Sequence, residues 1–291
     1  MVLKTGRFPK PGETILGGDF FIFQGGKGAN QAVAAARLGG NVSFICKVGN
    51  DSFGSDAIIQ YERDGIDISG IIKDATAPTG VAVITINKEG ENSIIVASGA
   101  NALFSVDDLK KSDRILADAA WLITQLETPL PVIAYLSDYA KQRGINFILN
   151  PAPAASLPDT VYDGLFLITP NESETRILTG IQVTDERSAK KATAVFNAKG
   201  VQNIIITLGS KGAYLDTKEF QGIIKTAKVT AVDTTAVGDV FNGALVVALA
   251  EDKSFKEAVQ FACRAAAFSV TKMGAQSSAP TRNELIDKNN L

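Results

Sequence analysis

The stretch from Asp233 to Ala244, DTTAVGDVFNGA, decides how the rest of this sequence is interpreted. The β-branched segment 228–232 before it predicts a strand, and the apolar segment behind it, to about Ala250, predicts a buried helix. The small residues between them stand where the N–H groups of a helix start are free to bind an anion. Asp239 suits such a site only if its carboxylate has a task, such as accepting a proton from a hydroxyl. The alternative is that Asp239 merely caps a helix.

Size and composition narrow the class of protein. The chain has 291 residues, of which 45% are hydrophobic, and this predicts a single domain spanning 1–291 with a full core. A net charge of −2 indicates neither a nucleic acid nor an anionic membrane as partner. Segment 1–10 has no apolar core of signal-peptide length, and no apolar run could span a bilayer. Cys46 and Cys263 lie inside apolar runs, as in proteins of a reducing compartment, so we expect a cytoplasmic protein.

The absence of histidine limits the chemistry. It excludes Ser-His-Asp and Cys-His catalysis, and any zinc site built on imidazole. Any reaction must therefore use carboxylates, lysines, backbone amides and a hard cation.

A glycine-rich loop near the N-terminus, Gly25–Gln31 (GGKGANQ), opens a predicted helix that runs to about Leu38. It is not a Walker A loop, because no Ser or Thr follows Lys27, and it is not a Gly-x-Gly-x-x-Gly loop. Its glycines allow close backbone approach, and its ammonium and amide groups can bind hydroxyls. The loop is thus better suited to a sugar or polyol than to a diphosphate, although a purely structural turn remains the alternative.

The N-terminal third contains strands outside the later repeating pattern. Segments 81–86 and 93–97 predict a hairpin with a polar connection, and segment 14–24 has strand-like character. We interpret 14–24 and 80–98 as a small β lid inserted in the domain. The run Phe20–Phe23 is too apolar for a solvated strand and predicts cover by the domain or by another subunit. A buried strand at 42–48 and a helix at 51–64 lie between these parts.

From position 121 onward, predicted strands and helices alternate, and this indicates βαβ units. The fold class is therefore α/β, with a Rossmann-like, mainly parallel sheet, helices on both faces and the β lid. A further apolar helix is predicted at 254–272. Ligands bind at the carboxyl ends of strands in such sheets. The strands are expected at 121–124, 145–149, 165–168 and 203–207, and the helices at 130–143, 171–179 and 185–199. The polar residues that follow these strands are Gln125, Glu127, Asn150, Asn171, Glu174, Thr207 and Gly209. Each of these could equally be a capping or solvated loop residue.

Two of these motifs resemble the signatures of the PfkB (ribokinase-like) carbohydrate kinases. Gly25–Gln31 is similar to the N-terminal signature and Asp233–Ala244 to the C-terminal one, while 150–153, 169–174 and 207–209 match intervening segments in the family's order. The resemblance covers essentially the whole chain. It implies ATP-dependent phosphorylation of a sugar. The sequence of residues 26–31 (GKGANQ) resembles that of the family's ribose kinases, which form D-ribose 5-phosphate from D-ribose.

The resemblance also implies roles for individual residues. It makes Asp239 the base that deprotonates the sugar hydroxyl, with the amides of Ala236, Val237 and Gly238 as an anion hole for the γ-phosphate. Mg²⁺ would be associated with Glu174 of the Asn171-x-x-Glu174 motif, and K⁺ with a loop beside the anion hole. The implied sugar contacts are Gly26, Lys27, Gly28, Asn30, Glu127 and Asp239; the ATP contacts are Asn171, Thr207, Gly209, Gly212, Gly238 and Cys263, the last beside the adenine; the K⁺ loop contains Asp233, Thr235, Ser269, Lys272, Gly274 and Ser278.

Two features depart from the family pattern. Family members begin with a buried strand and a Gly-Ser-x-Asn-x-Asp segment whose Asn and Asp hold the sugar, whereas Met1 follows directly after the place of that Asp. A chain starting there should lack one strand and bind sugar weakly, because two lost hydrogen bonds of roughly 1.5–3 kcal/mol each weaken binding by about two to four orders of magnitude. Val237 stands where the family usually has Ala or Gly, and its side chain is expected to crowd the loop.

The sequence therefore predicts an ATP-dependent sugar kinase that uses D-ribose, Mg²⁺ and K⁺ and forms a homodimer through its lids. Another sugar kinase of the same fold, for 2-deoxyribose or a ketose, is the nearest alternative. A truncated, non-catalytic family member is the alternative from a different class. A dinucleotide-dependent oxidoreductase is disfavoured, since no Gly-x-Gly-x-x-Gly follows a predicted strand.

Overall fold

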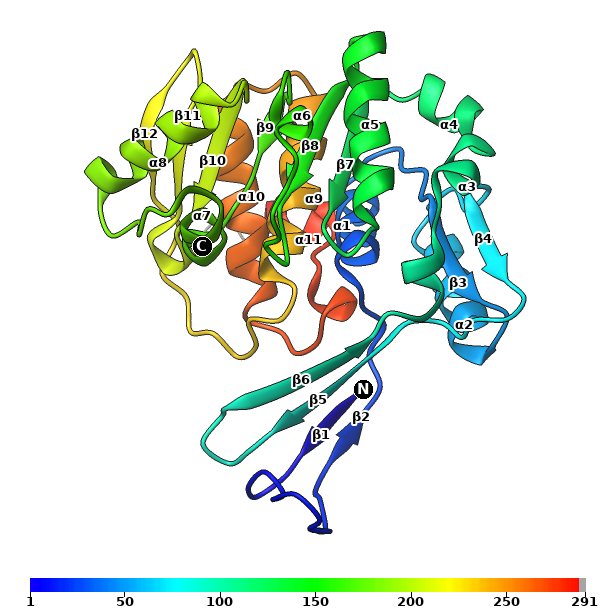
Figure 1. The fold of residues 1–291 in the computed structure, drawn as a ribbon. Coiled ribbons are helices and arrows are strands. Elements are labelled where there is room, and N and C mark those ends of the chain that lie inside the picture. Colours follow the sequence, from blue (N-terminus) through cyan, green and yellow to red (C-terminus); the bar gives the residue numbers. More distant parts are fainter. Residues whose placement is uncertain (288–291) are drawn as a thin grey trace.

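The computed structural model describes residues 1–287, so positions 288–291 of the expected domain lie outside the described residues. A six-stranded sheet in the order β12-β11-β10-β9-β8-β7 forms the centre of the main body (Figure 1). Its strands β7 to β10 are parallel, and β11 and β12 are antiparallel. The strands are β7 (Trp121–Gln125), β8 (Asn146–Asn150), β9 (Leu167–Ile168), β10 (Asn203–Thr207), β11 (Ala213–Asp216) and β12 (Gln221–Ile224).

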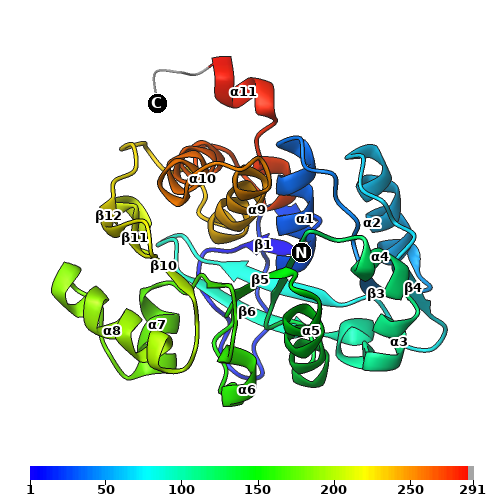
Figure 2. The same cartoon turned by 90° about the horizontal axis from the view of Figure 1, so that it is seen from above.

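Helices cover both faces of this sheet, as Figure 2 shows. Successive strand residues point to opposite faces, so Ile148 of β8 packs in one core while Phe147 and Leu149 pack in the other. The predicted Rossmann-like α/β class is confirmed. The first core lies under α1 (Lys27–Arg37), α9 (Val237–Ala250) and α10 (Phe255–Ser269), and the second under α5 (Leu130–Arg143), α6 (Asp159–Tyr162), α7 (Glu172–Thr179) and α8 (Glu186–Ala198).

The helix boundaries follow local capping chemistry. Asp185 and Ser254 start α8 and α10 with reciprocal capping boxes. Gly144 and Gly180 end α5 and α7 in the left-handed conformation that glycine adopts without strain. These signals explain why the helices predicted at 130–143, 171–179 and 185–199 agree with the structure to within a residue.

Two predictions about strands were wrong. Segment 228–232 forms no strand; the N–H groups of Val232 and Asp233 instead donate to the carbonyl of Val270, at the end of α10. The strands β11 and β12 were missed, because each is only four residues long. The helix α9 therefore follows a loop, and the antiparallel hairpin takes the sheet-edge position.

A separate pair of parallel strands lies beside the main sheet. Its strands β3 (Cys46–Gly49) and β4 (Ile71–Asp74) flank α2 (Ser52–Arg63). The predicted strand 42–48 is shorter than expected, since before Cys46 only the single bridge Ser43–Asp67 forms. The remaining elements are η1 (Gly99–Leu103), α3 (Val106–Lys110), α4 (Asp113–Ala117), η2 (Gly209–Lys211), η3 (Gln276–Ser278) and α11 (Arg282–Asp287). None of the described helices is long and apolar enough to cross a membrane.

A second sheet, which we call the lid, projects from the main body in the order β2-β1-β5-β6 (Figure 1). The predicted hairpin is confirmed as β5 (Val81–Ile86) and β6 (Asn92–Ala97). Of segment 14–24 only β2 (Phe20–Phe21) is strand, and β1 (Val2–Lys4), which was not predicted, pairs between β2 and β5. The lid therefore draws its strands from both ends of segment 1–97.

Hydrogen bonds attach the loop before β5 to the main body. The carboxylate of Asp51, the N-cap of α2, accepts hydrogen bonds from both N–H and Oγ1 of Thr79, at 2.7 Å each. Thr79 directly precedes Gly80, whose position leaves no room for a side chain because a Cβ would lie 2.6 Å from the carbonyl oxygen of Ser98. These contacts hold the two lid strands β5 and β6 together where they leave the main body.

Candidate active site

Close packing of α1 against α9 brings the two sequence motifs together. A Cβ on Gly243 would lie 2.6 Å from the carbonyl oxygen of Gln31 and 2.8 Å from the Cβ of Ala34, so only glycine permits this approach. Residues four apart share one face of a helix, so Asp239 lies one turn before Gly243. The crossing thus presents Asn30 and Gln31 to the Asp239 carboxylate.

The Asp239 carboxylate is buried and held by amides. Its side chain is 5% exposed; Asn30 Nδ2 donates to Oδ2 at 2.9 Å, and Gln31 Nε2 donates to Oδ1 at 3.2 Å. Burial raises the pKa of Asp239 to about 6, although the amides and the nearby Lys27 act to lower it. At neutral pH this group is an anion that binds a proton more readily than an ordinary aspartate.

The start of α9 is open beside this carboxylate. Ala236 is the N-cap residue in a left-handed conformation with φ 59°, and Val237 and Gly238 begin the helix. The first N–H groups of a helix have no partner within it; that of Val237 makes only a long 3.4 Å contact with the carbonyl of Thr234. Apart from its own helix backbone and chain neighbours, no described atom lies within 4 Å of a Cβ built on Gly238, so there is open space beside this residue.

The start of α1 is similarly accessible. Gly26, its N-cap, has φ 93° and open space around its Cβ position. Glu127 accepts a 2.9 Å hydrogen bond from the N–H of Lys27, and a Cβ on Gly28 would lie 3.0 Å from Nε2 of Gln125. Among the described residues no donor reaches the buried Oδ1 of Asn30. A ligand hydroxyl is the kind of group that would satisfy that oxygen.

Polar groups meet at the carboxyl ends of the strands, as the sequence predicted. Asn171 and Glu174 form a reciprocal capping box at the start of α7, and Asn171 bridges to Thr207 at the end of β10. The two side chains therefore cap α7, and both lie at the carboxyl end of the sheet beside β10. Burial raises the pKa of Glu174, and the negative charge of Asp239 acts in the same direction.

Three further predicted residues lie near the β10–β11 turn and α10. Gly209 and Gly212 have φ values of 55° and 102°, and a Cβ on Gly212 would stand 2.0 Å from the carbonyl oxygen of Ile224. Cys263 on α10 is buried, and burial raises the pKa of its thiol to about 11. Its carbonyl accepts a hydrogen bond from the hydroxyl of Thr226, so Cys263 lies next to the segment that follows β12.

Asp233 joins the two segments of the predicted cation loop. Its Oδ2 accepts from the N–H of Gly274 at 2.9 Å, while its Oδ1 accepts from the N–H and hydroxyl of Thr235. Burial raises the pKa of Asp233, but these hydrogen bonds outweigh burial and leave the pKa below its ordinary value. Within residues 1–287 no three acidic or cysteine side chains gather as a metal cluster, so backbone oxygens would have to supply most ligands of a cation here.

The side chains of the other loop residues point to local partners. Ser269 and Ser278 are each 1% exposed and donate to the carbonyls of Ala266 and Ala275. Lys272 pairs with Glu284 of α11 at 2.7 Å. Any part these residues play in binding a cation must therefore come through their main-chain carbonyls.

Three residues next to Asp239 were not predicted as part of the site: Gln31, Thr169 and Asn242. Gln31 is 2% exposed, and Thr169 and Asn242 are 1% exposed. For Gln31 and Asn242 a polar side chain inside an otherwise apolar helix was the available signal, and for Thr169 it was a polar residue directly after a buried strand. A buried amide or hydroxyl must find a hydrogen-bond partner.

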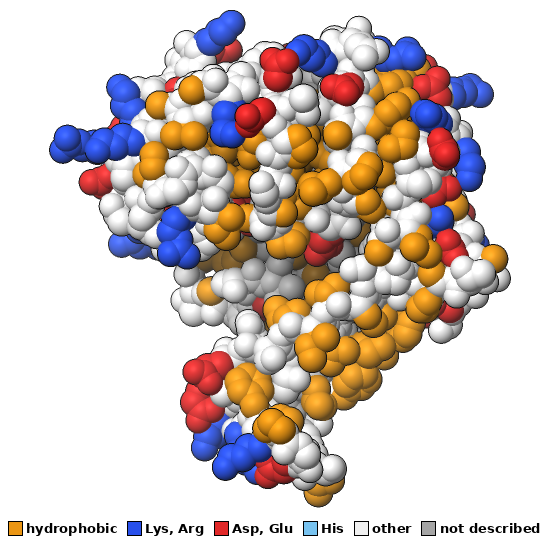
Figure 3. Space-filling view, in the orientation of Figure 1, with side chains coloured by type: hydrophobic (Ala, Val, Ile, Leu, Met, Phe, Trp, Pro, Cys, Tyr) orange, Lys and Arg blue, Asp and Glu red, His pale blue; other side chains and the backbone are white. Residues whose placement is uncertain are grey.

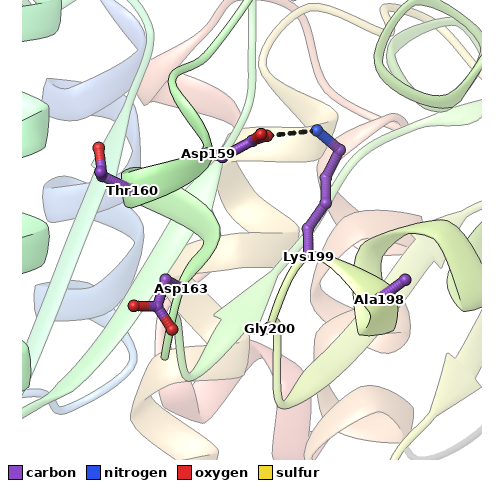
Figure 4. Close-up of a pocket in the computed structure, with 6 residues that line it drawn as sticks. All are labelled: Asp159, Thr160, Asp163, Ala198, Lys199 and Gly200. Carbon is purple, nitrogen blue, oxygen red and sulfur yellow. Dashed lines mark hydrogen bonds and ion pairs between the residues drawn. The ribbon is translucent and has the colours of Figure 1, made fainter.

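A separate cavity lies away from these residues. It measures about 500 Å³ and is lined by Asp159, Thr160, Asp163, Ala198, Lys199 and Gly200 (Figure 4). Its residues precede β9 and β10, at the sheet edge opposite Asp239, and Lys199 is paired with Asp159 at 2.6 Å. The cavity is open to solvent and its main charges are already neutralised, so it offers no comparable chemistry.

The comparisons with known proteins agree with this geometry. The sequence model described as "pfkB family carbohydrate kinase" matches residues 2–282. A ribokinase from Haemophilus influenzae is 48% identical over 98% of this chain and 94% of its own length. A deoxyribokinase from Salmonella typhi is 37% identical over 97% of this chain and 92% of its own length. The structure of Arabidopsis thaliana ribokinase complexed with ribose and ATP superposes with a TM-score of 0.90 and 31% identity, over 100% of this chain and 95% of that one.

Proposed function

The chain belongs to the pfkB family of carbohydrate kinases, and on that premise we propose that it transfers the γ-phosphate of ATP to the primary hydroxyl of D-ribose, forming D-ribose 5-phosphate. The observation that carries this proposal is the buried Asp239 carboxylate, with a pKa near 6, in the first turn of α9. A general base works best when its pKa lies near the operating pH. In one place the site thus has a proton acceptor and an anion-binding helix start.

The sugar lies at the start of α1 in this proposal. Asn30 Oδ1 accepts a sugar hydroxyl, which supplies the hydrogen bond that this buried oxygen lacks within the protein. Lys27 and Glu127 bind further hydroxyls, and the open backbone of Gly26 and Gly28 lets the ring approach closely. Asp239 takes the proton from the attacking hydroxyl, and the amides of Ala236, Val237 and Gly238 stabilise the charge of the transferring phosphoryl group.

The nucleotide occupies the neighbouring strand ends. Asn171, Thr207 and Gly209 contact phosphate and ribose, Gly212 keeps the β10–β11 turn tight, and Cys263 lies by the base. Mg²⁺ is usually held by one or two carboxylates together with substrate phosphates, and Glu174 is the carboxylate placed for this. The bound ion neutralises phosphate charge.

The loop that precedes α9 would hold a monovalent cation, K⁺ in this proposal, which would order the loop. The hydrogen bonds of Asp233 to Thr235 and Gly274 draw the two loop segments together, so that carbonyls of both, with those of residues such as Ser269, Lys272 and Ser278, can face one ion. The ion would touch neither substrate.

The lid supports a homodimer. Strand register places Phe20, Leu3, Thr85, Val83 and Ile95 side by side on one face of the lid, and the four apolar members are 36–70% exposed. Figure 3 shows hydrophobic side chains along the surface of the lid. A contiguous apolar face of this kind marks an interaction site, and a second lid covers it in our proposal. Both cysteines are free, in keeping with the cytoplasmic location that we expect.

A second sugar is a specific alternative, because a deoxyribokinase is 37% identical to this chain. Initial rates of ADP formation with D-ribose, 2-deoxy-D-ribose and D-fructose, at equal concentrations with Mg²⁺ and K⁺, distinguish the candidates. The proposal requires the largest kcat/KM for D-ribose. A larger value for 2-deoxy-D-ribose would replace the substrate but keep the chemistry, and no turnover with any sugar would favour the non-catalytic alternative.

A further inference from the structure

A chain of buried hydrogen bonds leads away from Asp239 to the edge of the sheet. The amide nitrogen of Gln31 that donates to Asp239 Oδ1 also donates to Oδ1 of Asn150, at 3.2 Å in each case. Asn150 is the last residue of β8, and its Nδ2 donates to the carbonyl of Thr169 at 3.0 Å. The carboxylate is thereby connected, through two amides, to the carboxyl ends of β8 and β9.

The chain then returns to α9. The hydroxyl of Thr169 donates to Oδ1 of Asn242 at 2.7 Å, and Nδ2 of Asn242 donates to the carbonyl of Gly238 at 2.8 Å. Since Gly238 precedes Asp239, the hydrogen bonds close a ring that begins and ends in the first turn of α9.

The side chains of this ring of hydrogen bonds are buried, and burial favours a single arrangement of them. Gln31, Asn150, Thr169 and Asn242 are each at most 6% exposed. Hydrogen bonds in a low-dielectric interior are strong, and leaving one partner unpaired there is costly. The ring therefore adopts a single arrangement. A side chain that leaves the ring leaves its neighbour without a hydrogen-bond partner.

We propose that Gln31, Asn150, Thr169 and Asn242 are positioning residues for phosphoryl transfer, which fix the Asp239 carboxylate and the first turn of α9 against the ends of β8 and β9. Segment 225–236 forms no strand, so no strand leads from the sheet directly into this turn. The side-chain ring supplies that connection. The inference rests on the proposed role of Asp239 as the base.

Positioning matters here because one turn of α9 carries both the proposed base and the amides that are proposed to bind phosphate. Asp239 must meet the sugar hydroxyl while the amides at 236–238 meet the phosphate, and misplacement by about 1 Å can cost a hundredfold in rate. Both groups move together only if the turn is rigid. A loosened turn should lower kcat and leave substrate binding, which other elements supply, nearly unchanged.

The Gln31 part of the ring has an electrostatic consequence as well. Three charged side chains face Asp239. Lys27 of α1 lowers the pKa of Asp239, and Glu127, in the loop after β7, raises it. The charge of Asp239 in turn raises the pKa of Glu174 on α7. The amides of Asn30 and Gln31 favour the ionised form. Removing the Gln31 amide should therefore raise the pKa of Asp239 further, by about one unit.

Two variants separate the halves of the ring. Gln31→Met removes the amide at similar length, and Thr169→Val removes only the hydroxyl. Thr169→Ser keeps the hydroxyl and should restore activity. The matched control is Thr193→Val: Thr193 is also fully buried, and its hydroxyl bonds to Lys190 and Asp216, away from the ring.

The first measurement is of kcat and KM for both substrates as a function of pH. The second is the titration of Asp239, followed by NMR in protein that carries ¹³C-labelled aspartate. The Asp239→Asn variant identifies the resonance of Asp239. We expect Thr169→Val to lower kcat by about ten- to a hundredfold with each KM within about twofold, and Thr193→Val to leave kcat unchanged. Gln31→Met should move both the NMR titration and the acidic limb of kcat/KM to higher pH.

Two results would overturn the inference: equal kcat for Thr169→Val and Thr193→Val, or an Asp239 titration unaffected by Gln31→Met. The NMR titration needs no turnover. A wild-type chain that phosphorylates no sugar but shows the Gln31-dependent titration would contradict the proposed function alone.

Discussion

Nδ2 of Asn30 donates a 2.9 Å hydrogen bond to Oδ2 of Asp239, although the two residues are 209 positions apart in the sequence. This bond joins the glycine-rich loop at the start of α1 to the anion-binding start of α9. The contact exists because Gly243 lets the two helices approach until a Cβ would touch the backbone of Gln31. The two elements that we propose to bind sugar and phosphate therefore share one buried carboxylate.

Asp239→Asn should abolish turnover. The amide keeps the size of the side chain but cannot accept the hydroxyl proton, and a general base contributes roughly 10²- to 10⁴-fold. We expect kcat to fall by that factor while KM for ATP stays within a few-fold, measured by coupled ADP release. An unchanged kcat would remove Asp239 from the chemistry.

The pH dependence follows from the raised pKa of Asp239. Only the ionised carboxylate accepts a proton, so kcat/KM should fall about tenfold per pH unit below pH 6 and level off above it. A profile of kcat/KM between pH 4.5 and 8.5 measures this, and a value that stays constant down to pH 4.5 would contradict it.

The same raised pKa predicts that Asp239 costs stability at neutral pH. Folding raises the pKa from 3.8 to about 6, so the folded chain favours the protonated form, and that advantage is lost as the pH rises through 6. The difference corresponds to about 3 kcal/mol. Asp239→Asn should therefore raise the free energy of unfolding at pH 8, with the gain shrinking toward pH 4. Urea unfolding at pH 8 and pH 4 measures the free energy of unfolding, and an equal gain at the two pH values would contradict the prediction.

Gly243→Ala should separate α1 from α9. In an isolated helix this change would be favourable by about 1 kcal/mol, but here the new Cβ would meet Gln31, Ala34 and Ala35 at 2.6–2.9 Å. Overpacking of this kind costs typically about 1–3 kcal/mol, and it displaces Asn30 from Asp239. We expect a lower melting temperature and a loss of kcat. Gly6→Ala, with no atom within 4 Å of its Cβ position, is the control.

Ile95→Lys should weaken the dimer that we propose. Ile95 is 70% exposed and lies opposite Val83 on the apolar face of the lid, where a buried lysine would lose its hydration. Sedimentation velocity should show more monomer than for the wild type. Ile177→Lys changes an isoleucine of similar exposure, 59%, on α7 and should leave the distribution unchanged. A wild-type monomer at micromolar concentration would contradict the dimer.

The sequence was informative where local signals determine structure. Capping residues such as Asp185, the terminating Gly144 and the alternating hairpin at 81–97 all act within a few residues, so their elements were predicted closely. The expected strand at 228–232 failed because tertiary contacts with Val270 take its N–H groups. β1 was missed because its pairing depends on a partner about 80 residues away.

The residues of the candidate site also differ in how well the sequence predicted them. Asp239 and Asn30 stood out because their motifs are unusual in composition, and the structure brings them together. Asn242 and Thr169 did not, because their role depends on the packing of α9 against the sheet, which no local pattern records. Asn171 and Glu174 were found, but their mutual capping bonds became visible only in three dimensions.

The most direct test of the central claim is to identify the product formed from ATP and D-ribose. In ³¹P NMR with proton coupling, wild-type chain with Mg²⁺ and K⁺ should yield ADP and one new phosphomonoester coupled to the two protons of C5, and Asp239→Asn should yield neither. ADP accompanied by free phosphate, or the same phosphomonoester formed equally fast by Asp239→Asn, would contradict transfer to the sugar by Asp239.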